Sequence, residues 1–128
     1  MHRIATLLIG LIAVLHLYIA WFEIFAWTTR GPEIFSTFPA ELFEPTQSMA
    51  ANQGLYNSFL AIGLIWSLFI TNPEWRFKVA SCFLLFVAVA GIFGAATVSP
   101  RIMIVQTVPA IIALIFAYLS YRKTAPTP

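Results

Sequence analysis

Charged side chains are scarce in this sequence. Asp, Glu, Lys and Arg together make up 9% of the 128 residues, whereas hydrophobic residues make up 60%. A soluble domain carries about 25% charged residues, so this chain has too few to cover a globular surface in water. The composition therefore excludes an ordinary soluble domain and predicts a protein whose outer surface lies in a lipid bilayer.

Cysteine and histidine are also rare. Cys82 is the single cysteine, so no disulfide framework is available, and its apolar neighbours predict a buried thiol. The two histidines, His2 and His16, lie in different environments, and no cluster of cysteines or acids completes a ligand set. We therefore expect no metal site.

Other sequence signatures of chemistry are missing as well. No glycine-rich loop precedes a helix, and no Ser or Cys stands beside a base at a diagnostic spacing. The sequence therefore requires no cofactor, and whether one is bound stays unknown. It also gives no reason to expect a nucleic-acid partner.

Four long apolar stretches fill most of the chain, at residues 4–27, 48–71, 77–98 and 102–121. Each has roughly 20 or more residues, which lets an α-helix cross a hydrocarbon core of about 30 Å. The period-2 alternation of membrane strands is absent. The sequence predicts an all-α, polytopic membrane protein with one domain over residues 1–128, a four-transmembrane-helix bundle. Residues 124–128 are expected to form a disordered tail.

The connection between the first two stretches, residues 28–47, is the only long one. Prolines interrupt it, and apolar side chains recur along it: Pro32, Phe35, Phe38, Pro39, Leu42, Phe43 and Pro45. This pattern predicts an amphipathic loop or short interfacial helix that lies on the bilayer and covers one end of the bundle.

Orientation follows from the positive charges. With four spans, the two termini and the second loop share a side, which carries Arg3, Arg76, Lys78, Arg122 and Lys123. The opposite side carries Arg30 and Arg101. The positive-inside rule then places both termini in the cytoplasm, and the membrane expected is a cytoplasmic (inner) membrane.

Four polar residues stand inside the apolar stretches: His16, Glu23, Asn57 and Gln106. Burying such groups in hydrocarbon costs several kcal/mol each unless they find partners. Counted inward from the expected outer helix ends, His16 and Asn57 lie at matched depths of about 15 Å, so we expect them to pair. A second layer nearer the outer surface holds Glu23, Gln53, Gln106 and Arg101, and there we expect Glu23 to hold Arg101.

Three strings of the sequence resemble one bacterial family. They are residues 16–23 (HLYIAWFE), 52–61 (NQGLYNSFLA) and 106–110 (QTVPA). They are similar to a family of small four-helix membrane proteins catalogued as domain of unknown function thirteen-oh-four. The resemblance spans nearly the whole chain. It implies the four-helix fold and no mechanism.

These observations favour a binding protein with an outward-facing polar and aromatic pocket within the membrane. The ligand would be a small amphipathic molecule such as a quinone, an isoprenoid or a lipid-like compound. The residues expected to bind it are His16, Glu23, Trp27, Asn52, Gln53, Tyr56, Asn57, Arg101 and Gln106.

Other interpretations stay open. The amides are equally compatible with interhelical hydrogen bonding, His16 with a neutral core histidine, and Glu23 with an interfacial side chain. A membrane enzyme of isomerase or redox type would use His16 and Glu23 as acid and base. A structural subunit of a membrane complex and a homo-oligomer also fit. Transport fits worst, because the polar residues stop midway across the bundle.

Overall fold

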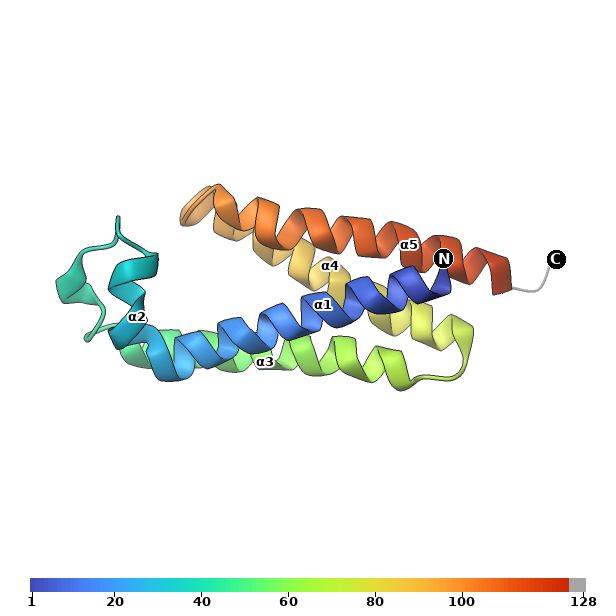
Figure 1. Cartoon of the computed structure of the whole chain (residues 1–128), viewed down its shortest axis with the longest axis horizontal. Helices are drawn as coiled ribbons and strands as arrows, with labels where there is room; N and C mark the ends of the chain where they lie inside the picture. The colour runs from blue at the N-terminus through green and yellow to red at the C-terminus, as the bar shows by residue number, and fades with distance from the viewer. Residues whose placement is uncertain (125–128) are drawn as a thin grey trace.

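The computed structural model describes residues 1–124. Of the disordered tail expected at residues 124–128, Thr124 is instead helical, and residues 125–128 lie outside the described part of the chain. The described chain is helical throughout its long elements, which confirms the all-α prediction (Figure 1). In order these are α1 (His2–Trp21), the π-helical turn η1 (Phe22–Ala26), α2 (Trp27–Ile34), the 3₁₀ turn η2 (Ala40–Leu42), α3 (Gln47–Phe69), α4 (Pro73–Thr97), the π-helical turn η3 (Met103–Thr107) and α5 (Val108–Thr124).

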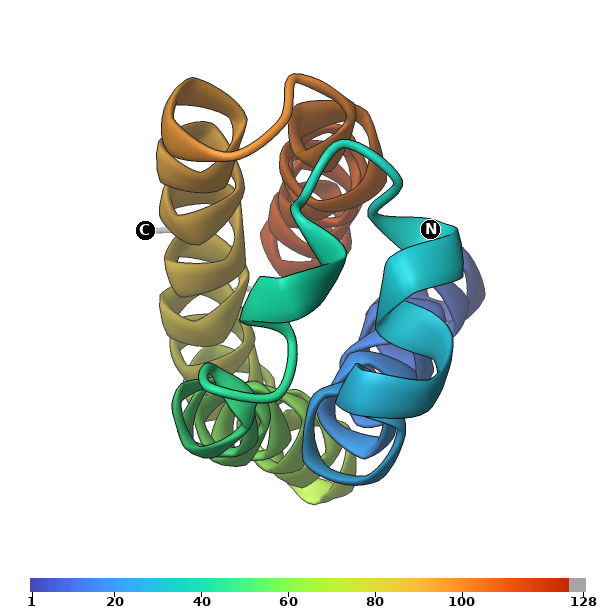
Figure 2. The same ribbon diagram turned by 90° about the vertical axis from the view of Figure 1, so that its left-hand side faces the viewer.

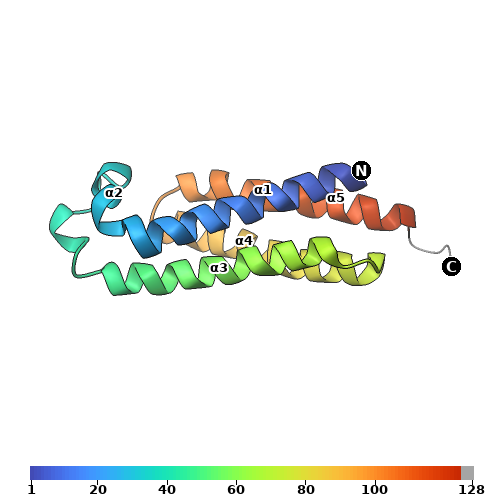
Figure 3. The same ribbon diagram turned by 60° about the horizontal axis from the view of Figure 1, so that its bottom comes forward.

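The long helices form a four-sided bundle in which α1 packs on α3, α3 on α4, α4 on α5, and α5 on α1. Helix α2 lies at one end, here called the cap end. Helix α1 begins and α5 ends at the opposite end, here called the terminal end (Figures 1 and 3). Toward the cap end the α1–α3 pair and the α4–α5 pair diverge (Figures 1 and 2).

The main core lies where the two pairs are close together. All four long helices contribute to it, through Ile9, Ile12, Ala13, Leu64, Ala80, Leu84, Val87, Ala88, Ala110 and Ala113. Small alanines are frequent among these residues, and they allow the helix backbones to approach closely in the absence of a large hydrophobic driving force.

The outward faces of the helices are as apolar as the core, with exposed side chains such as Leu7, Val14, Phe86 and Ile104. Three helical segments are long and apolar enough to cross a membrane: residues 2–34, 73–97 and 103–124. Helix α3 has 23 residues but is not among them. Asn52, Gln53 and Asn57 make its first half polar.

The thiol of Cys82 is exposed, so the prediction that it is buried was wrong. In a membrane-type bundle, apolar neighbours mark the lipid-facing side as much as the core, because both faces of the helix avoid water. Hydrophobicity alone therefore could not tell the two sides of α4 apart.

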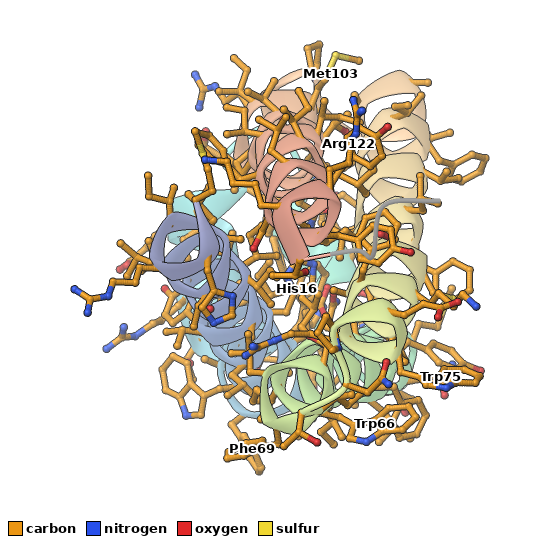
Figure 4. The ribbon with its side chains drawn as sticks, turned by 90° about the vertical axis from the view of Figure 1, so that its right-hand side faces the viewer. His16, Trp66, Phe69, Trp75, Met103 and Arg122 are labelled. Atoms are coloured by element: carbon orange, nitrogen blue, oxygen red, sulfur yellow. The ribbon has the colours of Figure 1, made fainter. Side chains whose placement is uncertain are left out.

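Near the α3–α4 connection, three aromatic side chains project outward: Trp66, Phe69 and Trp75 (Figure 4). They are 57%, 79% and 60% exposed. Tryptophan gathers at membrane–water interfaces, where its amphipathic ring sits at headgroup level. This arrangement accords with the apolar helices and indicates that a membrane surface would lie near the terminal end.

The first helical segment is longer than the sequence predicted, since α2 continues to Ile34 beyond the expected limit at Trp27. Ala26 departs from helical geometry (φ −125°, ψ 8°), and a fresh helix starts after it. Pro32 lies inside this helix, where it removes one N–H donor without ending the helix. The expected amphipathic loop at residues 28–47 therefore contains most of α2 and the short turn η2.

An aromatic cluster fills the cap end around Trp27. The ring centroid of Trp27 lies 5.1–6.3 Å from those of Phe22, Phe35, Phe38 and Phe43. These distances are within the range of favourable aromatic pairs. Trp27 Nε1 donates a hydrogen bond to Thr46 Oγ1 (3.0 Å), which ties α2 to the residue just before α3. We call these five aromatic residues the aromatic cap.

Candidate functional site

A side-chain hydrogen bond between two helical elements joins Glu23 and Asn57 inside the bundle. Asn57 Nδ2 donates a hydrogen bond to Glu23 Oε2 across 2.8 Å, and it lies 3.3 Å from the carbonyl oxygen of Gln53 in its own helix. Glu23 is half-buried in η1, and Asn57 is buried in α3. A π-helical turn interrupts regular helix geometry and occurs frequently at functional sites. The contact therefore combines a polar pair with an irregular helix.

Gly54 makes this contact geometrically accessible. A Cβ atom at residue 54 would lie 2.9 Å from the carbonyl oxygen of Ala20, 2.8 Å from Ile24 Cγ1 and 3.1 Å from Glu23 Cβ. Only a residue without a side chain lets α3 approach the end of α1 this closely. Sequence analysis did not identify Gly54 as a site residue, although it stands between Gln53 and Asn57.

His16 lies at the centre of the bundle and is 1% exposed (Figure 4). Its Nδ1 atom is 2.9 Å from the carbonyl oxygen of Ile12, one turn earlier in α1. A carbonyl oxygen only accepts, so Nδ1 carries the hydrogen, and in the neutral ring Nε2 is an acceptor. Nε2 is buried and has no hydrogen-bond partner among the described residues.

The expected pair of His16 and Asn57 is therefore wrong, since each has a different partner. The physical reason is the direction of side chains on helices. Every Cα–Cβ bond leans toward the N-terminus of its helix. Because α1 and α3 run antiparallel (Figure 1), Glu23 leans toward the terminal end and Asn57 toward the cap end, so that they meet. His16 leans away from Asn57, toward Ile12.

The expected ion pair between Glu23 and Arg101 is also wrong. Arg101 is exposed, and within residues 1–124 the ion pair that forms is Lys78–Glu74. Glu23 belongs to the α1–α3 pair and Arg101 to the start of the last helical segment, and these two pairs of helices diverge at this end (Figure 2).

Gln106 lies on the same diverging pair of helices as Arg101, half-buried in η3. A Cβ atom at Gly91 would lie 2.9 Å from the backbone nitrogen of Thr107 and 3.0 Å from Gln106 Cβ. Thr107 Oγ1 donates a hydrogen bond to the carbonyl oxygen of Ala88 (3.1 Å). Close packing thus holds η3 against α4.

The remaining predicted site residues do not join the Glu23–Asn57 contact. Asn52, Gln53 and Tyr56 are exposed on α3, although the backbone of Gln53 accepts the second Asn57 contact. Trp27 is part of the aromatic cap, one helical turn from Glu23. The structure thus brings together Glu23, Asn57 and the Gln53 backbone.

Two cavities are described, and both lie away from this contact. One of about 300 Å³ borders the aromatic cap, between Thr28, Pro32, Ala40, Phe43, Glu44 and Gln47. The other, of about 290 Å³, lies at the terminal end. Across residues 1–124, no three His, Cys, Asp or Glu side chains gather closely enough to hold a metal ion.

Comparison with known proteins gives a family and no activity. A family model described as "Protein of unknown function (DUF1304)" matches residues 10–118. The "Uncharacterized protein YpaA" of Lactococcus lactis subsp. lactis (strain IL1403) is 27% identical over 118 residues, which cover 90% of this chain and 98% of that protein. No solved structure matches the chain.

Proposed function

The chain belongs to the DUF1304 family of unknown function, and from that premise we propose that it is an integral membrane protein that binds a small amphipathic molecule. The ligand's polar end meets Glu23 and Asn57, and the ligand extends from there to His16, within the membrane and beneath the aromatic cap. A quinol or an isoprenoid alcohol, or a similar lipid-like alcohol, has the required chemistry.

In this proposal α3 joins the three strongly apolar segments as a fourth span, and both termini face the cytoplasm of a bacterial cell. The lysines and arginines support this orientation, since five lie toward the terminal end and two toward the cap end. The polar contact then lies in the outer half of the inner membrane, and the aromatic cap covers it from the outside.

One observation supports the proposal most directly. The side chain of Glu23 lies inside an apolar bundle, and most of its hydrogen-bond acceptor sites have no partner among the described residues. A carboxylate has about four acceptor sites, and the Asn57 bond occupies one. His16 Nε2 adds a buried acceptor. Both groups therefore complement a ligand that supplies hydrogen-bond donors, which is why a hydroxyl-bearing molecule fits better than a pure hydrocarbon.

We favour binding over catalysis because of the spacing of the two titratable groups. Glu23 and His16 are seven residues apart, about 10 Å along a helix. A general acid and a general base each need to lie within hydrogen-bond reach of the group on which they act. A pair this far apart reaches two ends of one elongated molecule more readily than one reacting bond.

The test is to purify the chain in mild detergent and to identify co-purifying lipophilic molecules by native mass spectrometry and extraction. We expect the wild type to retain a hydroxyl-bearing amphiphile that Glu23→Leu and Asn57→Leu lose. Glu33→Leu is the matched control, because Glu33 is an exposed acid of α2. Equal retention by all variants, or bulk phospholipid alone in the wild type, would refute the proposal.

A further inference from the structure

A second candidate site lies at the terminal end, far from Glu23. Here a cavity of about 290 Å³ opens between the beginnings of α1 and α4 and the end of α5. This volume is close to the lower limit of about 300 Å³ for small-molecule sites. The cavity therefore has room for a small polar group and not for a whole lipid.

Every polar side chain that lines this cavity is able to donate a hydrogen bond. The lining includes the guanidinium of Arg76, the imidazole of His2 and the hydroxyls of Thr6, Ser120 and Tyr121. No acidic side chain lines it. Groups of this kind complement a ligand that offers acceptor oxygens and negative charge.

Arg76 is held in place and keeps unused donors. Its Nη2 donates to the carbonyl oxygen of Leu68 (2.8 Å), at the end of α3, and its Nη1 donates to His2 Nε2 (3.2 Å). A guanidinium has five N–H donors, so these two bonds orient the group without exhausting it. The nearest acid in sequence, Glu74, is engaged with Lys78 at 2.6 Å. The charge of Arg76 is therefore not neutralised by a carboxylate of the described chain.

The rest of the cavity wall is apolar. Ile9 and Ala117 form part of it, and the ring of Phe77 stacks on that of Tyr121 with centroids 4.8 Å apart and planes inclined by 4°. An ion with no apolar portion would leave this surface without a partner. The cavity also lies at the end of the bundle where Trp66 and Trp75 project outward (Figure 4), which is the level of lipid headgroups.

We propose that this cavity binds a phosphate group, carried by an anionic phospholipid or by a soluble phosphate, with Arg76 as its charged anchor. Basic cavities between membrane helices are a known form of headgroup recognition. The proposal does not depend on the outer site, because the two sites share no residue and lie at opposite ends of the bundle.

The test measures thermal unfolding in nanodiscs of phosphatidylcholine, with and without phosphatidylglycerol, and in phosphatidylcholine discs with added inorganic phosphate. We expect the anionic lipid to raise the unfolding midpoint of the wild type, and Arg76→Gln to weaken its apparent binding by about tenfold or more. A rise with phosphatidylglycerol alone identifies a lipid as the source. An equal rise with inorganic phosphate identifies a soluble phosphate.

Two further variants keep the test decisive. Arg122→Gln removes a positive charge at the same end outside the cavity, so it should retain the response. Ser120→Leu fills part of the cavity without touching the hydrogen bonds of Arg76, so it should abolish the response even where Arg76→Gln folds poorly. A response that survives Ser120→Leu, or that Arg122→Gln also removes, overturns the proposal. Glu23→Leu should leave the response intact, which separates this site from the outer one.

Discussion

The hydrogen bond between Asn57 and Glu23 allows a quantitative test of the polar site. Interhelical side-chain bonds in membrane proteins contribute about 0.6 kcal/mol on average and about 1.7 kcal/mol at most. A carboxylate acceptor at 2.8 Å places this bond toward the upper part of that range. In a double-mutant cycle of Glu23→Leu and Asn57→Leu, we therefore expect a coupling free energy of about 1–2 kcal/mol.

The assay is reversible unfolding in mixed micelles, followed by far-UV circular dichroism for the four proteins of the cycle. Glu23→Gln is the matched control, because the side-chain oxygen of glutamine accepts the Asn57 hydrogen bond at nearly the same reach. This variant should therefore retain most of the stability that Glu23→Leu loses. Arg101→Gln should show no coupling with Glu23, since the two form no ion pair. Additivity within about 0.5 kcal/mol, or equal losses for Gln and Leu at residue 23, would refute the contact.

Three other predictions follow from the packing and the topology. Gly54→Ala should destabilise the bundle by about 1–3 kcal/mol, because the added Cβ would press on the backbone oxygen of Ala20. In the same unfolding assay Gly10→Ala should be neutral or stabilising, because its Cβ meets nothing within 4 Å. Equal effects of the two variants would contradict the close approach of α3 to α1. His16→Leu should keep or raise the melting temperature, because it removes a buried atom without a partner, while retention of the co-purified ligand falls; unchanged retention would leave His16 a core residue. In a cysteine-free background of intact cells, an impermeant thiol reagent should label Thr37→Cys and spare Thr124→Cys, and the reverse pattern would invert the orientation.

The sequence predicted the helices well because length and hydrophobicity decide them. It identified Glu23 and Asn57 as unusual because a polar side chain in an apolar run is costly wherever it points. It could not pair them correctly, since counting along the axis locates Cα atoms and ignores the lean of side chains toward each helix N-terminus. The observed partner Glu23 and the expected partner His16 are seven residues apart, about two helical turns.

The irregular features of the fold were harder to predict. The π-helical turn at Phe22–Ala26 has no composition that distinguishes it from ordinary helix. The other turn, Met103–Thr107, ends just before Pro109, and the backbone N–H of Val108 reaches the carbonyl oxygen of Met103 five residues earlier. Proline at residue 109 removes one backbone N–H, but a lost N–H is compatible with a kink, a wider turn or no change, so the form of this turn could not be predicted.

These two wide turns divide their helices into segments with different rotational phase. An additional residue within a turn rotates everything beyond it by about 100° around the helix axis. Trp27, the first residue after the turn near Glu23, therefore owes its inward direction to one surplus residue. Removing a single residue from Phe22–Ala26 would leave the core half of α1 unchanged and turn the cap half outward. In this segment of the chain, length is therefore under tighter constraint than residue identity, and a one-residue deletion should do more harm than most substitutions.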